Sequence, residues 1–134
     1  MDISEIPLFS MLRGRLGYLS DRQKVIAQNV ANAETPGYTP GDLKPFTFAS
    51  AMKAQGAGAM AVTQPGHITP PSHAGAPPKA LKVKDSETRL DGNSVVLEEE
   101  MMKMTDARMS YDAAISFYQK SLNMLRMAAR APGR

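Results

Sequence analysis

The side chains that could bind a metal or move a proton are few and scattered along these 134 residues. The two histidines, His67 and His73, lie in a proline- and glycine-rich segment with no nearby carboxylate or cysteine to complete a metal site. Three consecutive glutamates, 98–100, would point about 100° apart on a helix, so they do not converge on a substrate or a cation. Their placement instead suits the positive end of the helix dipole.

The chain has no cysteine, which excludes thiolate zinc sites and thiol nucleophiles. It also lacks a glycine-rich phosphate loop and a paired Ser/His/Asp arrangement. We therefore expect no catalytic residue, no metal site and no bound cofactor, and we predict that the chain is not an enzyme.

The polar stretch from Asn29 to Tyr38 is the most informative one. Asn32 can satisfy free carbonyls where a helix ends, and Thr35 is biased out of the helical region because a proline follows it. Pro36-Gly37 suits the centre of a type II turn, where glycine supplies a positive φ. Local chemistry alone therefore predicts a helix stop followed by a tight turn.

A second polar stretch, Asp91-Gly92, predicts another turn, and Asn93 or Ser94 is predicted to cap the helix that follows.

A helix is predicted from about residue 8 to residue 33, with Ser4 or Pro7 at its start. Its apolar residues alternate at spacings of four and three, which predicts a packing seam broken only by Gln23. The seam consists of Leu12, Leu16, Leu19, Ile26, Val30 and Ala33. Gly14 and Gly17 either weaken the early turns or mark the close approach of another backbone.

The carboxyl-terminal segment repeats this spacing over a longer helix, interrupted only by Arg108. Its predicted seam consists of Leu97, Met101, Met104, Tyr111, Ile115, Tyr118, Leu122, Leu125 and Ala129. Each helix also carries a second apolar stripe. The stripes are Met11, Tyr18 and Val25 in the first helix, and Met102, Met109, Phe117 and Met124 in the second. Either the middle of the chain covers these stripes, or other chains do, and we favour other chains.

The chain divides into an amino-terminal helix and turn (1–38), an irregular Ala/Gly/Pro-rich middle (39–92) and a carboxyl-terminal helix (93–134). Loop, extended segment or disorder is expected in the middle, with short strands near 46–48 and 80–83. The predicted fold class is all-α.

Charge is spread evenly, since each of three consecutive thirds carries one more basic than acidic residue. This spread disfavours a nucleic-acid partner, which needs clustered Lys and Arg. No apolar run is long enough to insert in a membrane, and the acidic amino terminus lacks the features of a secretory signal peptide.

The run from Asn29 to Tyr38 closely resembles the amino-terminal signature of the bacterial flagellar axial proteins, which are the rod, hook and hook-junction subunits. The matching residues are Asn29, Asn32, Thr35, Pro36, Gly37 and Tyr38. Asp91-Gly92-Asn93-Ser94-Val95, followed by Leu97-Glu98-x-Glu100-Met101, is similar to the start of the last helix in proximal rod subunits of that family. The run Leu16-Gly17-Tyr18-Leu19-Ser20 looks similar to those subunits too.

This resemblance implies a structural rod subunit whose terminal helices pair as an antiparallel coiled coil. It also implies type III export without a cleaved signal peptide, and a place in the periplasmic rod of the basal body. The implied partners are other copies of the chain, the adaptor FliE, the rod protein FlgC and the ring protein FliF. Another rod subunit is the nearest alternative, and a basic coiled-coil nucleic-acid-binding protein is a more distant one.

Overall fold

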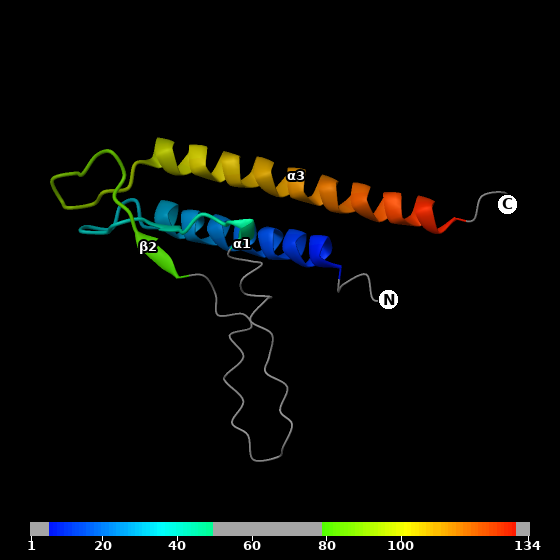
Figure 1. The fold of residues 1–134 in the computed structure, drawn as a ribbon. Helices are drawn as coiled ribbons and strands as arrows, with labels where there is room; N and C mark the ends of the chain where they lie inside the picture. Colours follow the sequence, from blue (N-terminus) through cyan, green and yellow to red (C-terminus); the bar gives the residue numbers. More distant parts are fainter. Residues whose placement is uncertain (1–5, 50–78, 131–134) are drawn as a thin grey trace, which may run out of the picture.

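The computed structural model describes residues 6–49 and 79–130, and its main feature is a pair of long antiparallel helices lying side by side (Figure 1). Helix α1 spans Pro7–Ala31 and helix α3 spans Leu97–Ala129. Strand β1, Gly41–Leu43, pairs antiparallel with strand β2, Ala80–Lys82, and β1 contacts α1. Both histidines, and most of the middle for which loop or disorder was predicted, lie outside the described residues.

Helix α1 begins and ends as its sequence predicts. Pro7 occupies the first turn, where its missing N–H is not needed. At the other end, Asn32 Nδ2 donates to the carbonyl of Gln28 at 2.8 Å. The chain then turns through Gly37, whose φ is +70°, and the Tyr38 N–H donates to the Thr35 carbonyl at 3.3 Å.

The predicted all-α fold class is wrong in one respect, because the structure also contains a small two-stranded sheet. A strand does form in the region predicted near 80–83, and it pairs with Gly41–Leu43, whereas no strand forms at 46–48, where the other was predicted. Gly41 is held at α1 because its N–H and its carbonyl both bond to the side chain of Asn29. Phe46 instead packs its ring on Tyr18, with 5.7 Å between ring centroids.

The core between the helices combines large side chains from α1 with small ones from α3. In α1 the buried apolar residues include Phe9, Leu12, Leu19 and Ile26. In α3 the buried residues are Glu100, Ala107, Ala114 and Ser121, which recur every seven positions. Small residues on one helix let its neighbour approach closely, and the strict heptad period keeps them on one line.

Four of the nine residues of the seam predicted for α3 therefore lie one position after the heptad of buried residues. These four are Met101, Ile115, Leu122 and Ala129. Met101 is 65% exposed and Arg108 is exposed, whereas Glu100 and Ala107 are fully buried. Ile115 and Leu122 are half-buried beside the buried Ala114 and Ser121. The prediction from hydrophobic periodicity misplaced these positions, because it takes the more hydrophobic methionine, isoleucine and leucine to be buried in preference to alanine, serine and glutamate.

The remaining seam positions show a graded burial. Leu97, Met104, Tyr111 and Tyr118 are half-buried in α3, as is Leu16 in α1. Val30 and Leu125 are 39% and 38% exposed. Asn29, the residue before Val30, is buried in its place. Asn29 is 1% exposed because its side chain lies in a polar network rather than in the apolar core.

The second apolar stripes of the two helices have different surroundings. In α1, Tyr18 lies against Phe46 and Val25 approaches Gly41, so the chain itself partly covers this stripe, whose three residues are half-buried. In α3, Met102, Met109, Phe117 and Met124 are between 51% and 69% exposed. Within the described residues, the α1 stripe is thus partly covered by other segments of the chain, and the α3 stripe is exposed.

Candidate functional site: a polar junction and two apolar surfaces

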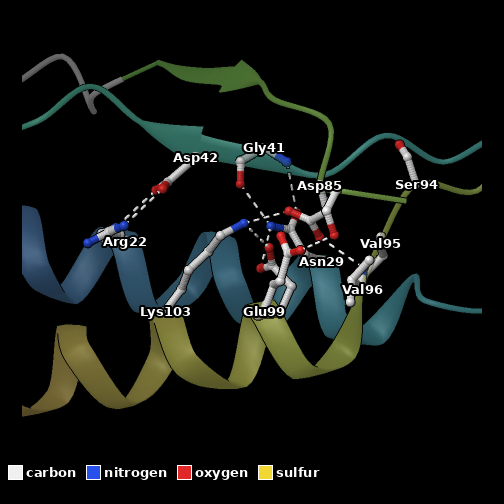
Figure 2. A network of polar contacts seen from close by, with 12 residues as sticks. Arg22, Asn29, Gly41, Asp42, Asp85, Ser94, Val95, Val96, Glu99 and Lys103 are labelled. Carbon is white, nitrogen blue, oxygen red and sulfur yellow. Dashed lines mark hydrogen bonds and ion pairs between the residues drawn. The ribbon is translucent and has the colours of Figure 1, made fainter. Parts of the chain in front are cut away.

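The two polar stretches that the sequence separates by more than fifty residues meet where α1 ends and α3 begins. We call this region the polar junction; it comprises the segments 29–42 and 85–103 (Figure 2). The Ser94 N–H donates to the Tyr38 carbonyl at 3.0 Å, and the Gly37 N–H donates to the Asp91 carbonyl at 3.0 Å. These backbone bonds bring the two motif segments directly together.

Asn29 lies at the centre of the junction. Its Nδ2 donates to the Gly41 carbonyl and to Glu100 Oε2, both at 2.8 Å. Its Oδ1 accepts from the Gly41 N–H at 3.0 Å and from the Tyr38 hydroxyl at 3.2 Å. This single amide therefore joins α1, β1, the turn after α1 and α3.

Glu100 is completely buried, and its charge is balanced by Lys103. Lys103 Nζ donates to Glu100 Oε1 and to Asp85 Oδ1, each at 2.6 Å. Burial alone lowers the pKa of Lys103, but the hydrogen bonds to Asp85 and Glu100 outweigh it and raise that pKa above its usual value. Asp85 in turn accepts the Val96 N–H through Oδ2 at 2.9 Å, which satisfies a backbone donor where α3 starts.

The sequence prediction that Asn93 caps α3 is wrong. That helix begins at Leu97, after Val96, and has no side-chain cap. Asn93 Nδ2 instead donates to three carbonyls at the end of α1, those of Asn32 and Ala33 at 3.0 Å and that of Thr35 at 2.7 Å. Asn93 thus closes the carboxyl-terminal end of the other helix, where carbonyls have no intrahelical partner.

Two glycines complete the junction. Gly92 has a φ of +83°, and a Cβ placed there would lie 3.4 Å from the Cα of Gly37. Gly37 also has a positive φ. Both turns therefore need glycine for their conformation.

An ion pair flanks the junction on the side of the sheet. Arg22 of α1 makes two hydrogen bonds to Asp42 of β1, at 3.0 and 2.9 Å, and also approaches Asp106 of α3 at 3.6 Å. Burial raises the pKa of Asp42, but the bonds from Arg22 and the Leu43 N–H prevail and lower it. The same pairing raises the pKa of Arg22.

The polar junction is suited to holding the segments of the chain in register. Each buried side-chain nitrogen and oxygen within the described ranges has a hydrogen-bond partner. The described residues also contain no cluster of three or more His, Cys, Asp or Glu side chains that could hold a metal ion. No helix in the same ranges is long and apolar enough to cross a membrane.

Sequence reasoning missed Glu100, Lys103 and Asp85 as members of the junction. Glu100 was interpreted through the helix dipole, together with Glu98 and Glu99, and as part of the family-like run 97–101, but not as a buried residue. Glu98 is indeed exposed, and Glu99 bonds to Ser86. One available signal was Lys103, which stands three positions after Glu100 and so lies on the same helix face.

Two apolar surfaces lie outside the junction. The first is a groove of about 370 Å³ between the start of α1 and the middle of α3, which we call the apolar groove. Its lining residues are Leu8, Leu12, Arg15, Phe48, Ser110, Ala113, Ala114 and Phe117. The second is the exposed stripe of α3 described above, Met102, Met109, Phe117 and Met124, which we call the methionine face. Phe117 belongs to both surfaces.

The sequence of this chain is similar to proteins of one family. A family model described as "Flagella basal body rod protein" matches residues 12–39, which include the first polar stretch. The flagellar basal body rod protein FlgB of Agrobacterium fabrum is 31% identical over 131 residues, covering 93% of this chain and 94% of that protein. The chain belongs to the FlgB family. FlgB of Escherichia coli K12 is 34% identical over 112 residues, 75% of this chain and 77% of the relative.

As a FlgB family member, the chain is a structural subunit of the flagellar basal body rod. FlgB of Buchnera aphidicola, at 25% identity over 124 residues, matches 88% of the chain and 91% of its own length. The FlgB likeness therefore extends over both helices and includes the polar junction.

Proposed function

We propose that this chain assembles helically with other copies and neighbouring subunits through the methionine face of α3, and that it transmits torque within the proximal rod. The observation that carries this proposal is the uncovered apolar stripe. Within the described residues, the four large apolar side chains of this stripe are more than half exposed. Contiguous exposed apolar surface marks interaction sites in soluble proteins, and methionine adapts to partners of slightly different shape.

The helix pair works in this proposal as a coiled-coil unit of fixed register. A buried polar contact in a helix pair fixes register, because a shifted pairing would leave its groups unsatisfied. The bond between Asn29 and Glu100, at 2.8 Å, is such a contact. A subunit that bears torque needs its two helices to resist sliding, and the polar junction supplies that resistance at one end.

The partners follow from the family. We infer FliE, FlgC and FliF as neighbours, together with other copies of the chain. We also infer export through the flagellar type III apparatus without a cleaved signal peptide, and a final position in the periplasmic part of the basal body. The FlgB name of the relatives favours this position over that of another rod subunit.

Charge placed on the methionine face tests the proposal. Met109→Glu should block incorporation of the chain into basal bodies in a complemented strain, because a buried carboxylate without a partner is strongly unfavourable. Gln119→Glu adds the same charge at another exposed position of α3 and should be incorporated normally. Normal incorporation and motility with Met109→Glu would overturn the proposal.

A second variant probes the helix pair itself. Leu19 is 4% exposed in the core, so Leu19→Asp should prevent both the pairing and the assembly. Circular dichroism before and after addition of FliE and FlgC should show a gain of helix in the original chain and no gain in this variant.

A further inference from the structure

The loop before α3 presents a leucine to water on a well-ordered turn. Leu90 is the only large apolar residue between Lys84 and Ser94, and it is fully exposed. The turn beneath it is held by several backbone bonds, since the Arg89 N–H donates to the Asn93 carbonyl at 2.7 Å and the Gly92 N–H to the Arg89 carbonyl at 2.9 Å. Single exposed leucines are common, but this one is fixed in place by the polar junction.

The apolar groove lies toward the opposite end of the helix pair. Leu8, Leu12 and Arg15 contribute to it from the first turns of α1, whereas the loop that carries Leu90 adjoins the carboxyl-terminal end of α1 (Figure 1). From Leu12 to Ala31 the helix rises by about 28 Å at 1.5 Å per residue. Leu90 therefore cannot enter the groove of its own chain.

The charges beside the leucine and the groove are complementary. Among the described residues that line the groove, Arg15 is the charged one, and its guanidinium lies 5.9 Å from the centre of the Phe48 ring. Glu87 and Asp91 are exposed beside Leu90. We call residues 85–93 the acidic tip; its one basic residue, Arg89, is paired with Glu34 at 3.2 Å. An acidic tip around a leucine thus matches an apolar groove with a basic edge.

We propose that Leu90 of one copy inserts into the apolar groove of the next copy, with Asp91 or Glu87 close to Arg15. This inference rests on the proposed assembly into a rod and names one of its contacts. The two surfaces are different and lie at opposite ends, so the contact is heterologous. Repeated from copy to copy, such a contact builds an open helical array rather than a closed dimer.

Cross-linking between two singly substituted full-length chains tests this contact directly, because the chain has no cysteine of its own. Leu90→Cys and Ser110→Cys place a thiol on the tip and in the groove. When the two variants are mixed under mild oxidation, their mixed disulfide should form at least about tenfold faster than the one between Val83→Cys and Ser110→Cys. Val83 is also an exposed apolar residue, so it controls for random collision. Equal rates for the two mixtures would overturn the proposal.

Incorporation into basal bodies separates this inference from the proposed function. Leu90→Ser should reduce incorporation by at least about tenfold while leaving the circular dichroism spectrum of the purified chain unchanged, since the side chain makes no contribution to the core. If Met109→Glu blocks incorporation and Leu90→Ser does not, the rod function stands and the Leu90 contact is wrong. If neither variant reduces incorporation, both proposals fail.

Discussion

Asn29 of α1 and Glu100 of α3, 71 positions apart in the chain, are joined by a hydrogen bond of 2.8 Å between two fully buried side chains. Asn29 also bonds to Gly41, and Glu100 to Lys103, so the contact links both helices to the sheet and to the loop before α3. A buried network of this kind is favourable only when every member is satisfied, which makes its individual members sensitive to substitution.

Asn29→Asp should therefore be strongly destabilising. It would place a second carboxylate against Glu100 and remove the donor to the Gly41 carbonyl, and an unpaired buried charge costs about 3 kcal/mol or more. Urea denaturation should show this loss in the free energy of unfolding. Asn123→Asp makes the same change at an exposed site of α3 and should alter that free energy by less than about 0.5 kcal/mol. Equal stability of the two variants would mean that the bond to Glu100 is not formed.

Asn93→Ala should loosen the end of α1 although Asn93 belongs to the loop before α3. The substitution removes the Asn93 donor from the carbonyls of Asn32, Ala33 and Thr35. The Asn32 and Thr35 carbonyls keep a backbone donor each, from the N–H groups of Thr35 and Tyr38, so the expected loss is about 1–2 kcal/mol. Hydrogen exchange should become faster at the last turn of α1. If exchange increases only at the first turn of α3, Asn93 acts as a cap of α3 after all.

Much of this architecture could be predicted from the sequence, because it depends on local chemistry. The start of α1 at Pro7, its end at Asn32 and the turn at Gly37 all follow from residues within a few positions of each other. The apolar periodicity likewise predicted both helices, since a helical repeat is visible in one short window.

The parts that sequence reasoning missed depend on contacts between distant segments. Asn93 is a good helix cap by residue type, but whether it serves the next helix or the previous one depends on where residue 93 lies in space. Part of the α3 seam was misplaced by one residue, because the residues of α3 that are buried against α1 are small or polar and a hydrophobicity pattern does not rank them as buried. Glu100 is buried only because Asn29 and Lys103 meet it there, and no hydrophobicity pattern predicts a buried glutamate.

Two glycine substitutions should have opposite effects. Gly92→Ala forces a side chain into a backbone with a φ of +83°, which should cost about 1–2 kcal/mol. Gly17→Ala lies within α1, where nothing in the described structure comes within 4 Å of an added Cβ, and it should stabilise the chain by up to about 1 kcal/mol. Thermal unfolding of the two variants measures both effects. A stabilising Gly92→Ala would contradict the turn conformation.

The ion pair between Arg22 and Asp42 should make stability depend on acid pH. The pKa of Asp42 is lower in the folded chain than in the unfolded chain, so its contribution is fully present above the ordinary aspartate pKa. The contribution is lost as the pH falls through the lowered folded value. At pH 7, Asp42→Asn should reduce the free energy of unfolding by about 1 kcal/mol or less, because the pair is partly exposed.

The difference between the original chain and Asp42→Asn should shrink toward zero as the pH is lowered, since protonated Asp42 is as neutral as asparagine. Urea denaturation at a series of pH values between 7 and 2 measures this convergence. Asp112→Asn removes a carboxylate at an exposed position of α3 and serves as the control, with a difference that stays small at every pH. A stability gap for Asp42→Asn that remains constant down to pH 2 would show that the charge of Asp42 does not stabilise the fold, and that its effect comes from packing alone.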